Sequence, residues 1–214
     1  ACARLAAAAC PPVADIISTY TVCGNGDIDL KVDFRPQDYL PYLPRMGVTL
    51  ALDPTLENLT YLGLGPGQTY CDLKENASFG LWRSTVSQQY VDYIRPQEYG
   101  NHYDTRMLAL LSPHGLGLAV IARQPFEFSA RHHTDAQLEK ATHDVSLARS
   151  EQVILSLDAA QGGLGSNSCG PEPLPQHRLY PKRRQLHVLL RPVHLSHGDL
   201  PAFCRALPPE RDTL

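Results

Sequence analysis

The stretch Ile28-Asp29-Leu30-Lys31-Val32-Asp33-Phe34 places an apolar residue at every second position and a charged residue between each pair. Successive side chains of a β-strand point to opposite faces of the sheet. This alternation is therefore typical of an antiparallel strand with one buried face and one face in water. The preceding Cys23-Gly24-Asn25-Gly26-Asp27 is a strong hairpin turn signal. Together the two stretches predict a β-hairpin at the surface of an antiparallel sheet.

Short apolar runs of the same kind recur along the chain between 18 prolines and 15 glycines, which favours many short strands over a helical domain. Ser112-Pro113-His114-Gly115 predicts a second hairpin turn. Residues 134–141 predict a helix with Thr134 as its N-cap and Gln137 three positions later, and a short helical turn is expected within residues 76–82. We predict an all-β, antiparallel β-sandwich. The expected strands cover residues 17–22, 28–34, 45–52, 60–64, 105–111, 117–122, 126–130, 152–157 and 185–191.

The size and charge of the chain limit its possible classes. With 214 residues, 43% of them hydrophobic, it can bury one sizeable core. The 19 basic and 22 acidic residues form no basic face suited to nucleic acid, and no apolar run reaches the roughly 18 residues of a membrane span.

Residues 1–16 are alanine-rich without the charged start of a signal peptide, so we expect a leader or linker there. The domain is expected to cover residues 17–193, and 194–214 are expected to form a loosely ordered tail.

The cysteines and histidines do not follow a metal-binding pattern. Six cysteines contain no C-x-x-C pair and no histidine at ligand spacing, so no metal site is predicted. Reduced thiols and a cytoplasmic location are our expectation for a chain too long to need disulfides as its framework. His132, His133 and His143 are interpreted as polar residues of a loop and a helix face.

A glycine-rich stretch follows the apolar run at 153–157. Residues 161–171 read Q-G-G-L-G-S-N-S-C-G-P, with glycines that permit close approach and short polar side chains that can form hydrogen bonds. Such a loop either lines a binding site or only connects two strands. The residues themselves leave both interpretations open.

Four ordered blocks resemble the C-terminal domain, called the small chain or domain 5, of glycoside hydrolase family 2 β-galactosidases. The 161–171 loop is similar to the loop near that domain's C-terminus, and residues 61–72 are similar to its G-x-G-P-x-E-x-Y-x-D segment. Gln68 stands where the family usually has Glu. The remaining blocks are residues 93–101 followed by Arg106, similar to Y-x-x-P-Q-E-N-G-N with a following arginine, and residues 126–130 with 138–143, similar to F-x-F-(S/N) and L-x-x-A-x-H.

The resemblance implies a supersandwich fold shared with galactose mutarotases, with the family's first strands missing before residue 17. It also implies a role in completing the galactose site of a separate catalytic barrel domain, which would make that barrel segment and a galactoside the partners of this chain. Both catalytic glutamates of the family belong to the barrel. No catalytic residue is therefore predicted here, and the chain alone is expected to be inactive. The family's Mg and Na sites lie in other domains, so no cofactor is expected in this chain.

The resemblance identifies Asn167, Ser168 and Cys169 as candidate substrate-binding residues. Cys169 stands where many members carry a tryptophan that reaches into the galactose site, although a subset carries S-N-S-C-G-P as this chain does. A thiol in place of an indole removes a stacking surface worth about 1 kcal/mol or more. The alternatives for Cys169 are a buried inert thiol or a nucleophile.

Other residues are given structural interpretations. Asp72 is expected to accept backbone N–H bonds of a turn, Trp82 to pack in the core, and Arg106 to pair with Glu98. Glu127 and Asp158 are expected to orient neighbouring groups rather than to act as acid or base. Two alternative functions are a free-standing or degenerate carbohydrate-binding or interaction module without catalysis, and a mutarotase-like epimerase, the latter resting on fold analogy alone.

Overall fold

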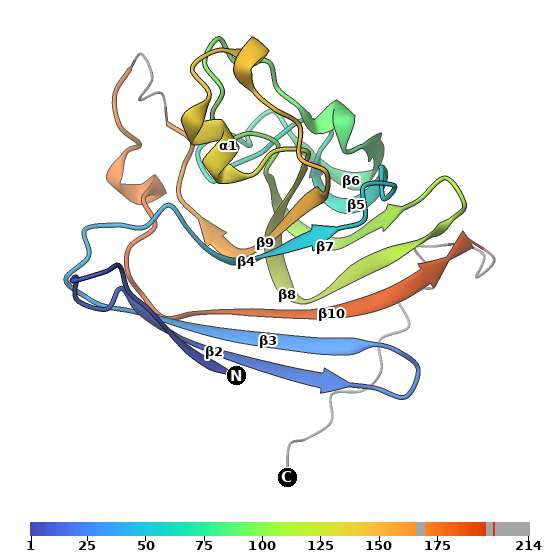
Figure 1. Cartoon of the computed structure of the whole chain (residues 1–214), viewed down its shortest axis with the longest axis horizontal. Coiled ribbons are helices and arrows are strands. Elements are labelled where there is room, and N and C mark those ends of the chain that lie inside the picture. Colours follow the sequence, from blue (N-terminus) through green and yellow to red (C-terminus); the bar gives the residue numbers. More distant parts are fainter. Residues whose placement is uncertain (166–169, 196–198, 200–214) are drawn as a thin grey trace.

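The computed structural model describes residues 1–165, 170–195 and 199, whose strands form one antiparallel sheet of ten strands (Figure 1). The predicted all-β antiparallel class is thereby confirmed. The strands are β1 (Cys2–Leu5), β2 (Ala14–Val22), β3 (Ile28–Pro36), β4 (Arg45–Leu52), β5 (Asn58–Gly65), β6 (Ser78–Thr85), β7 (His102–Leu111), β8 (Leu116–Arg131), β9 (Val153–Gln161) and β10 (Arg184–His194). The helix is α1 (Asp135–Lys140), and the 3-10 turns are η1 (Ser87–Gln89), η2 (Asp144–Ser146) and η3 (Pro175–His177).

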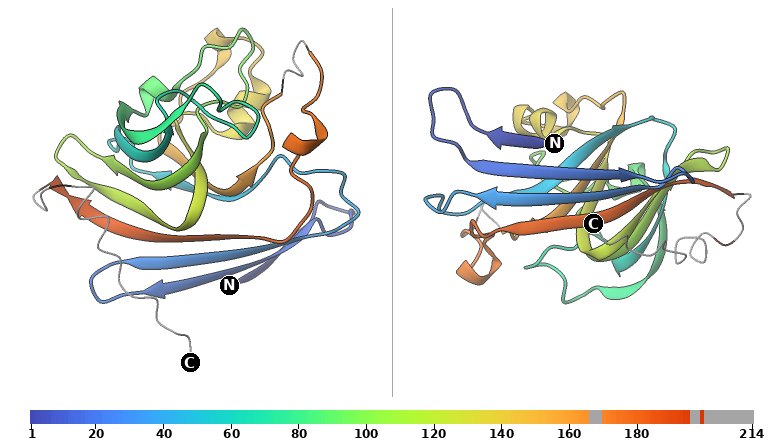
Figure 2. Two further views of the ribbon diagram at one scale, coloured as in Figure 1. Left: turned by 180° about the vertical axis from the view of Figure 1, so that it is seen from behind. Right: turned by 90° about the horizontal axis from the view of Figure 1, so that it is seen from below.

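The long strand β8 turns this sheet into two facing layers. The strand order along the main path is β1-β2-β3-β10-β8-β7-β5-β6, and β4 joins through β9, which also pairs with β8. The first half of β8 pairs with β10, whereas its second half, after Pro125, pairs with β9. As a result β4 and β9 lie above β10 and β3 (Figures 1 and 2). The sequence analysis expected two strands here because residues 123–125 interrupt the apolar pattern.

The main core fills the space between these layers. It contains Val32 from β3, Val188 from β10, Leu155 from β9 and Phe128 from β8, each 0% exposed. The alternation in residues 28–34 follows from this packing, because Leu30, Val32 and Phe34 all point into the core. Burying these side chains is the main favourable contribution to folding.

The local turn signals are also confirmed. The Cys23 N–H donates to the Asp27 carbonyl and Gly26 adopts a φ of 88°, which closes the first hairpin. The second hairpin closes through the Ser112 N–H and the Leu116 carbonyl. At α1 the Thr134 hydroxyl accepts from the Gln137 N–H while the Gln137 side chain accepts from the Thr134 N–H, which is the predicted capping arrangement.

Two regions differ from the sequence-based expectation. Most of the helical turn expected within residues 76–82 is instead the start of β6, which pairs with β5 along its whole length. Within the expected leader, residues 2–5 form β1 and pair with β2, which begins at Ala14 instead of residue 17. Both β1 and β6 are edge strands, each paired along one side with its neighbour in the sequence. Among the described residues, no helix combines the length and the apolar character needed to cross a membrane.

Candidate functional site

The glycine-rich stretch after β9 is fixed by a carboxylate from a distant part of the sequence, the segment between β5 and β6. The two oxygens of Asp72 accept the backbone N–H groups of Leu164 and Gly165, both at 2.9 Å. A Cβ at Gly163 would lie 2.6 Å from the Asp72 Cγ, and Gly165 has a φ of 65°. Glycine is required at both positions for these reasons. The expectation for Asp72 is confirmed in part, because it accepts backbone N–H groups, but these belong to the stretch after β9, 92 and 93 residues further along the chain, instead of to the glycine-rich block that ends at Asp72.

Three further backbone bonds hold the start of this stretch. The Gln161 N–H donates to a Glu127 carboxylate oxygen at 3.0 Å. The Gly162 N–H donates to the Pro44 carbonyl at 2.8 Å, and the Gly163 N–H donates to the His177 carbonyl at 2.7 Å. The described part of the loop, residues 161–165, is therefore preorganised by five hydrogen bonds to other segments, counting the two to Asp72.

Replacing Asp72 with alanine is expected to release Leu164 and Gly165. Hydrogen bonds to a charged group contribute about 1.5–3 kcal/mol. Amide hydrogen exchange at these two positions should therefore become at least about tenfold faster in the variant. Glu75→Ala, at an exposed neighbouring carboxylate, is the control and should leave the exchange unchanged. Equal exchange in Asp72→Ala and the wild type would contradict the role given to Asp72.

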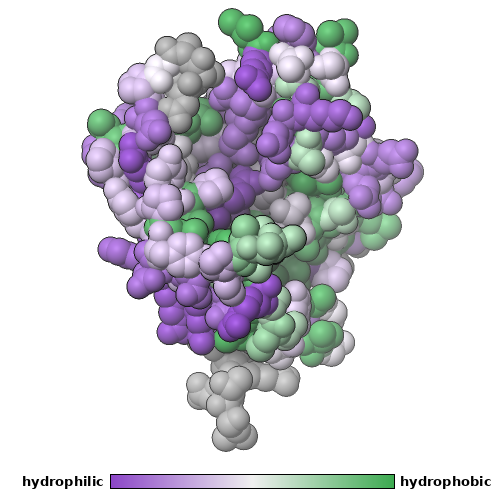
Figure 3. Space-filling view, turned by 60° about the vertical axis from the view of Figure 1, so that its left-hand side comes forward, coloured by the Kyte–Doolittle hydropathy of each residue, from purple (hydrophilic) through white to green (hydrophobic). Residues whose placement is uncertain are grey.

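A groove of about 780 Å³ opens beside this loop. Figure 3 views the side of the molecule that carries η3, where a hollow is surrounded largely by hydrophilic residues. The groove brings together parts of the chain that are far apart in sequence, namely the segment before β4, the segment before β7, α1, the loop after β9 and η3. Its lining includes Tyr42, Arg45, Glu98, Leu138, Leu164 and Arg178.

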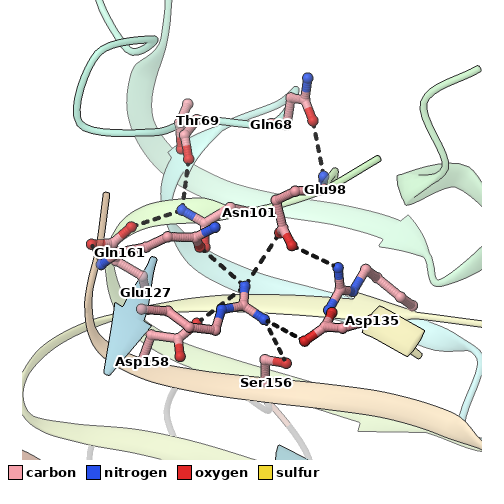
Figure 4. A network of polar contacts seen from close by, with 12 residues as sticks. Gln68, Thr69, Glu98, Asn101, Glu127, Asp135, Ser156, Asp158 and Gln161 are labelled. Atoms are coloured by element: carbon pink, nitrogen blue, oxygen red, sulfur yellow. Dashed lines mark hydrogen bonds and ion pairs between the residues drawn. The ribbon is translucent and has the colours of Figure 1, made fainter. Parts of the chain in front are cut away.

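Two arginines and three carboxylates form a connected ion-pair network at and below this groove (Figure 4). Arg131 is fully buried and donates to Glu98 at 2.9 Å and to Asp135 at 2.6 Å. Arg45 lies 3.2 Å from Glu98 and 3.5 Å from Asp158, and it also donates to the Gln161 side-chain oxygen at 3.2 Å. The network joins β4, β8, β9, α1 and the segment before β7, so it fixes the relative positions of the groove walls.

One carboxyl group of this network, Asp158, and a neighbouring one, Glu127, have raised pKa values. Burial raises the pKa of Glu127 to about 7, although the Asn101 amide and the Gln161 N–H both donate to it. Burial also raises the pKa of Asp158 to about 6, opposed by the nearby positive charge of Arg45. In both cases removal from water outweighs the donors and cations that favour the charged form.

The pH dependence of stability should reveal the Glu127 carboxyl. Between pH 4.5 and about 7 the native state holds a proton that the unfolded state has released, so this contribution to stability is lost as the pH rises through that window. Glu127→Gln does not titrate. The free energy of unfolding of Glu127→Gln, relative to that of the wild type, should therefore increase as the pH rises across the window. Urea unfolding below and above this pH window measures the difference in the free energy of unfolding. Glu75→Gln, at an exposed carboxylate, is the control. A difference between variant and wild type that stays constant with pH would contradict the assignment.

The residues proposed from the sequence have different outcomes. Asn167, Ser168 and Cys169 lie outside the described residues, and the described stretch leading to them borders the groove. Trp82 packs against the core and its indole N–H donates to the Gly63 carbonyl at 3.2 Å, as expected. The expected Arg106–Glu98 pair is wrong. Arg106 is exposed and pairs with Asp104 at 2.9 Å, whereas Glu98 pairs with the two network arginines.

Three residues of the groove and its network, Arg45, Arg131 and Tyr42, are not predicted by the sequence. The two arginines stand at the ends of predicted apolar strands, where a charged residue usually marks the return to solvent. Their position did not distinguish them from surface residues. The only local signal for Arg131 is Asp135, four residues later and paired with it.

His132 and His133 contact protein side chains. His132 lies 2.8 Å from a Glu57 oxygen, and the His133 ring nitrogen lies 2.8 Å from the Tyr99 hydroxyl. Within the part of the chain that the structure describes, no group of three or more His, Cys, Asp or Glu residues is arranged to hold a metal ion.

Comparison with known proteins identifies the family. The family described as Beta galactosidase small chain matches residues 3–190. A β-galactosidase of Actinobacillus pleuropneumoniae is 35% identical over 161 residues, which is 75% of this chain and 15% of that protein. One from Staphylococcus xylosus is 35% identical over 171 residues, 80% of this chain and 17% of that protein. One from Lactobacillus delbrueckii subsp. bulgaricus is 34% identical over 184 residues, 85% and 18% of the respective lengths.

These matches cover most of this chain and a small part of each relative. The chain spans 15–18% of the length of these relatives. The family match includes residues 3–16, which contain most of β1 and the start of β2. With this match and identities above 30% over 75–85% of its length, the chain belongs to the β-galactosidase small-chain family.

Proposed function

We propose that this chain is the C-terminal domain of a β-galactosidase and completes the galactose site of a separate catalytic barrel segment. In this role the loop at residues 161–171 faces the barrel and presents Asn167, Ser168 and Cys169 to the terminal galactose. The barrel cleaves the glycosidic bond. This chain positions the sugar and stabilises the assembly.

The observation that carries the proposal is the preorganised start of this loop. Five hydrogen bonds hold residues 161–165 at the edge of the groove of about 780 Å³. A binding loop held in place by a rigid scaffold loses little conformational entropy when a ligand binds, which favours affinity. The family membership supplies the ligand class, because the matched relatives are named β-galactosidases.

The carboxylates of the described part suit structural roles. Glycoside hydrolysis requires two carboxyl groups that flank the scissile bond, one of them a proton donor. Glu98 is held between two arginines, and Glu127 is only 5% exposed and accepts two hydrogen bonds from the protein. A pKa of about 7 would suit a general acid, but this burial leaves Glu127 little access to a glycosidic oxygen. We therefore assign the chemistry to the barrel segment.

We further propose that the assembly works in the cytoplasm. Cys2, Cys10, Cys23 and Cys71 are free thiols, and burial raises the pKa of Cys71 to about 11, which keeps it protonated and unreactive. Free thiols of this kind persist in a reducing compartment. The protein is alkylated without reductant, first in the native state and then after unfolding, and is analysed by mass spectrometry. We expect all four cysteines to be modified after unfolding.

A galactosidase assay tests the proposed division of labour. The chain is purified and assayed with a chromogenic β-galactoside alone and after mixing with a β-galactosidase that lacks its own small-chain domain. We expect no turnover by the chain alone, and turnover or a lower KM after mixing. Turnover by the chain alone would refute the assignment of chemistry to the barrel. No effect of the chain on the truncated enzyme would refute its role in the galactose site.

A further inference from the structure

A second apolar cluster lies on the face of the sheet that points away from the main core. Its members alternate with core residues along the same strands. Leu189 stands between the core residues Val188 and Leu190, and Ile121 follows the core residue Val120. The right-hand view of Figure 2 looks onto this side of β3 and β10, opposite to β4 and β9. We call this group the outer cluster; it consists of Met107, Ala109, Leu111, Ala119, Ile121, Leu189 and Val193, with Leu62 packed against them.

The outer cluster is contiguous because its members are neighbours across the strands. Ile121 of β8 pairs with Met107 of β7 on one side and with Leu189 of β10 on the other. Ala119, two residues earlier in β8, pairs with Ala109 of β7. Side chains at directly opposed positions on one face of a sheet contact each other. The cluster therefore forms one apolar patch across β5, β7, β8 and β10.

The outer cluster is buried although the rest of the same face is exposed. Leu189 is 0% exposed and Met107 is 5% exposed. Leu189 pairs with Asp29, which in turn pairs with Thr21, so all three residues point to one face. On this face Thr21 of β2 and Lys31 of β3 are exposed. A cover therefore lies over β7, β8 and β10 but not over β2 and β3.

The described elements do not supply this cover. Among the described residues, the outer cluster includes none from outside β5, β7, β8 and β10. The helix α1 and the strands β4 and β9 lie on the opposite side of β10 (Figure 1). The cover must therefore come from another part of this chain or from another molecule.

A buried ion pair at the edge of the outer cluster extends the covered area. Arg191 stands two residues from both Leu189 and Val193 along β10, so it points to the same face. Its guanidinium donates to both carboxylate oxygens of Asp27, at 2.9 and 2.8 Å. The two side chains are only 7% and 2% exposed. An ion pair on an uncovered sheet face would remain in contact with water, so the cover also reaches Arg191.

The chain that follows β10 begins at the edge of the outer cluster. Val193 is the last member along β10, and the strand ends at the next residue. The Leu195 N–H then donates to the Gly115 carbonyl at 2.9 Å. Gly115 has a φ of 78°, and a Cβ there would lie 2.7 Å from the Leu195 side chain. These contacts hold the start of the C-terminal segment against the β7–β8 hairpin, which follows Leu111 of the cluster.

The C-terminal segment has the sequence of an amphipathic helix. Residues 200–214 lie outside the described residues. Their sequence contains four apolar residues with the i, i+3, i+4, i+7 spacing of one helix face, namely Leu200, Phe203, Cys204 and Leu207. Asp199 precedes this run as a candidate N-cap, and Pro208-Pro209 follow it as a stop signal. The pattern predicts a helix over residues 200–207.

The dimensions of this predicted helix match the outer cluster. At about 1.5 Å per residue, residues 200–207 extend about 12 Å. Leu189 and Val193 are four residues apart in β10, which corresponds to about 13 Å. Residues 196–199 bridge up to about 14 Å, enough to bring the helix from Leu195 over the cluster. A helix this short is marginal in water, so it needs an apolar surface to form.

We propose that the C-terminal segment folds back on its own domain and packs the apolar face of a helix at residues 200–207 on the outer cluster. The helix adds a third layer below β7, β8 and β10 and closes this face to other partners. The loosely ordered tail expected from the sequence then begins after Pro209. This inference does not depend on the proposed function.

Alkylation of Cys204 in the native, whole chain tests the proposal. Cys10 is exposed between β1 and β2 and provides the rate of an accessible thiol. Peptide mass spectrometry gives both rates, each divided by the rate of the same thiol in urea. We expect Cys204 to react at least about tenfold more slowly than Cys10, because the helix must detach before its buried face is modified. Equal rates for the two thiols would overturn the proposal.

Two pairs of variants locate the contact. Met107→Lys places a charge in the outer cluster and Leu207→Asp places one on the helix face, so each should make Cys204 as reactive as an accessible thiol. The controls are Thr21→Lys, on the exposed part of the same sheet face, and Ala202→Asp, on the opposite side of the helix. Both should leave Cys204 protected. Leu207→Asp leaves the sheet unaltered and decides the matter if Met107→Lys does not fold. Protection that persists in Leu207→Asp refutes docking through this helix face.

A second copy of the chain and the truncated β-galactosidase are the competing occupants of the outer cluster. Protection of Cys204 that grows with protein concentration assigns the cover to a second copy. Protection that arises only after mixing with the truncated enzyme assigns it to that partner. Either result overturns the proposal, whereas protection independent of both supports it. No sugar and no catalysis enter this experiment, so its outcome is separate from that of the galactosidase assay.

Discussion

Truncation of Phe128 to alanine is expected to lower the free energy of unfolding by about 3–5 kcal/mol. Its ring is fully buried in the second half of β8. It stacks on the His102 ring at a centroid distance of 4.9 Å and meets the Tyr61 ring edge-on at 5.4 Å. The cavity left by alanine would cause these rings to lose both contacts and apolar burial, because cores relax only partly around a deletion.

Urea denaturation measures this loss, and Phe79 provides the matched control. Phe79 lies on the edge strand β6 and is 51% exposed, so Phe79→Ala should change the free energy of unfolding by less than about 1 kcal/mol. Similar losses for the two variants would mean that the core does not lie between the layers joined by β8.

Gly47→Ala is expected to destabilise the protein by at least about 3 kcal/mol, at the upper end of overpacking effects. Gly47 lies at an irregularity in the pairing of β4 with β9. A Cβ there would lie 1.8 Å from an oxygen of Asp158 and 2.5 Å from the Leu157 carbonyl oxygen. Asp158 is 1% exposed and the second obstacle is backbone, so neither can move aside cheaply.

The control for this variant is Gly67→Ala, where no atom lies within 4 Å of the added Cβ. We expect the stability of Gly67→Ala to remain within about 1 kcal/mol of the wild type. Thermal or urea unfolding of both variants provides the comparison. A Gly47→Ala protein as stable as Gly67→Ala would show that Asp158 is not fixed against β4, and the network of Arg45 and Asp158 would then not hold the groove wall.

The sequence predicts those parts of the fold that depend on local interactions. The alternation in residues 28–34, the glycine at position 26 and the capping pair of Thr134 and Gln137 act over a few residues, and each matches the structure. The strand β6 was missed because its exposed positions carry the apolar Phe79 and Leu81 while Gly80 occupies a less exposed one, so the alternation in burial does not appear as an alternation in polarity. Its pairing with β5 decides its conformation, and pairing of this kind is a tertiary effect.

The candidate site was predicted only in part because its contacts are distant in sequence. Asp72 reaches Leu164 and Gly165 across 92 and 93 positions, and Arg45 reaches Gln161 across 116. The glycines of the loop were recognised, but their purpose follows from the approach of the Asp72 carboxylate, which no local pattern indicates. The ion-pair network combines five elements, so its members resemble ordinary surface charges until the strands are assembled.

The most direct test of the central claim is Cys169→Trp in the enzyme assembled from this chain and the truncated β-galactosidase. If the loop contacts the galactose, an indole at position 169 adds a stacking surface worth about 1 kcal/mol. We therefore expect KM for a β-galactoside to change about fivefold while kcat changes less than twofold. Cys10→Trp, at an exposed cysteine between β1 and β2, is the control and should leave both constants unchanged. An unchanged KM for Cys169→Trp would contradict the account, because the loop would then not touch the sugar.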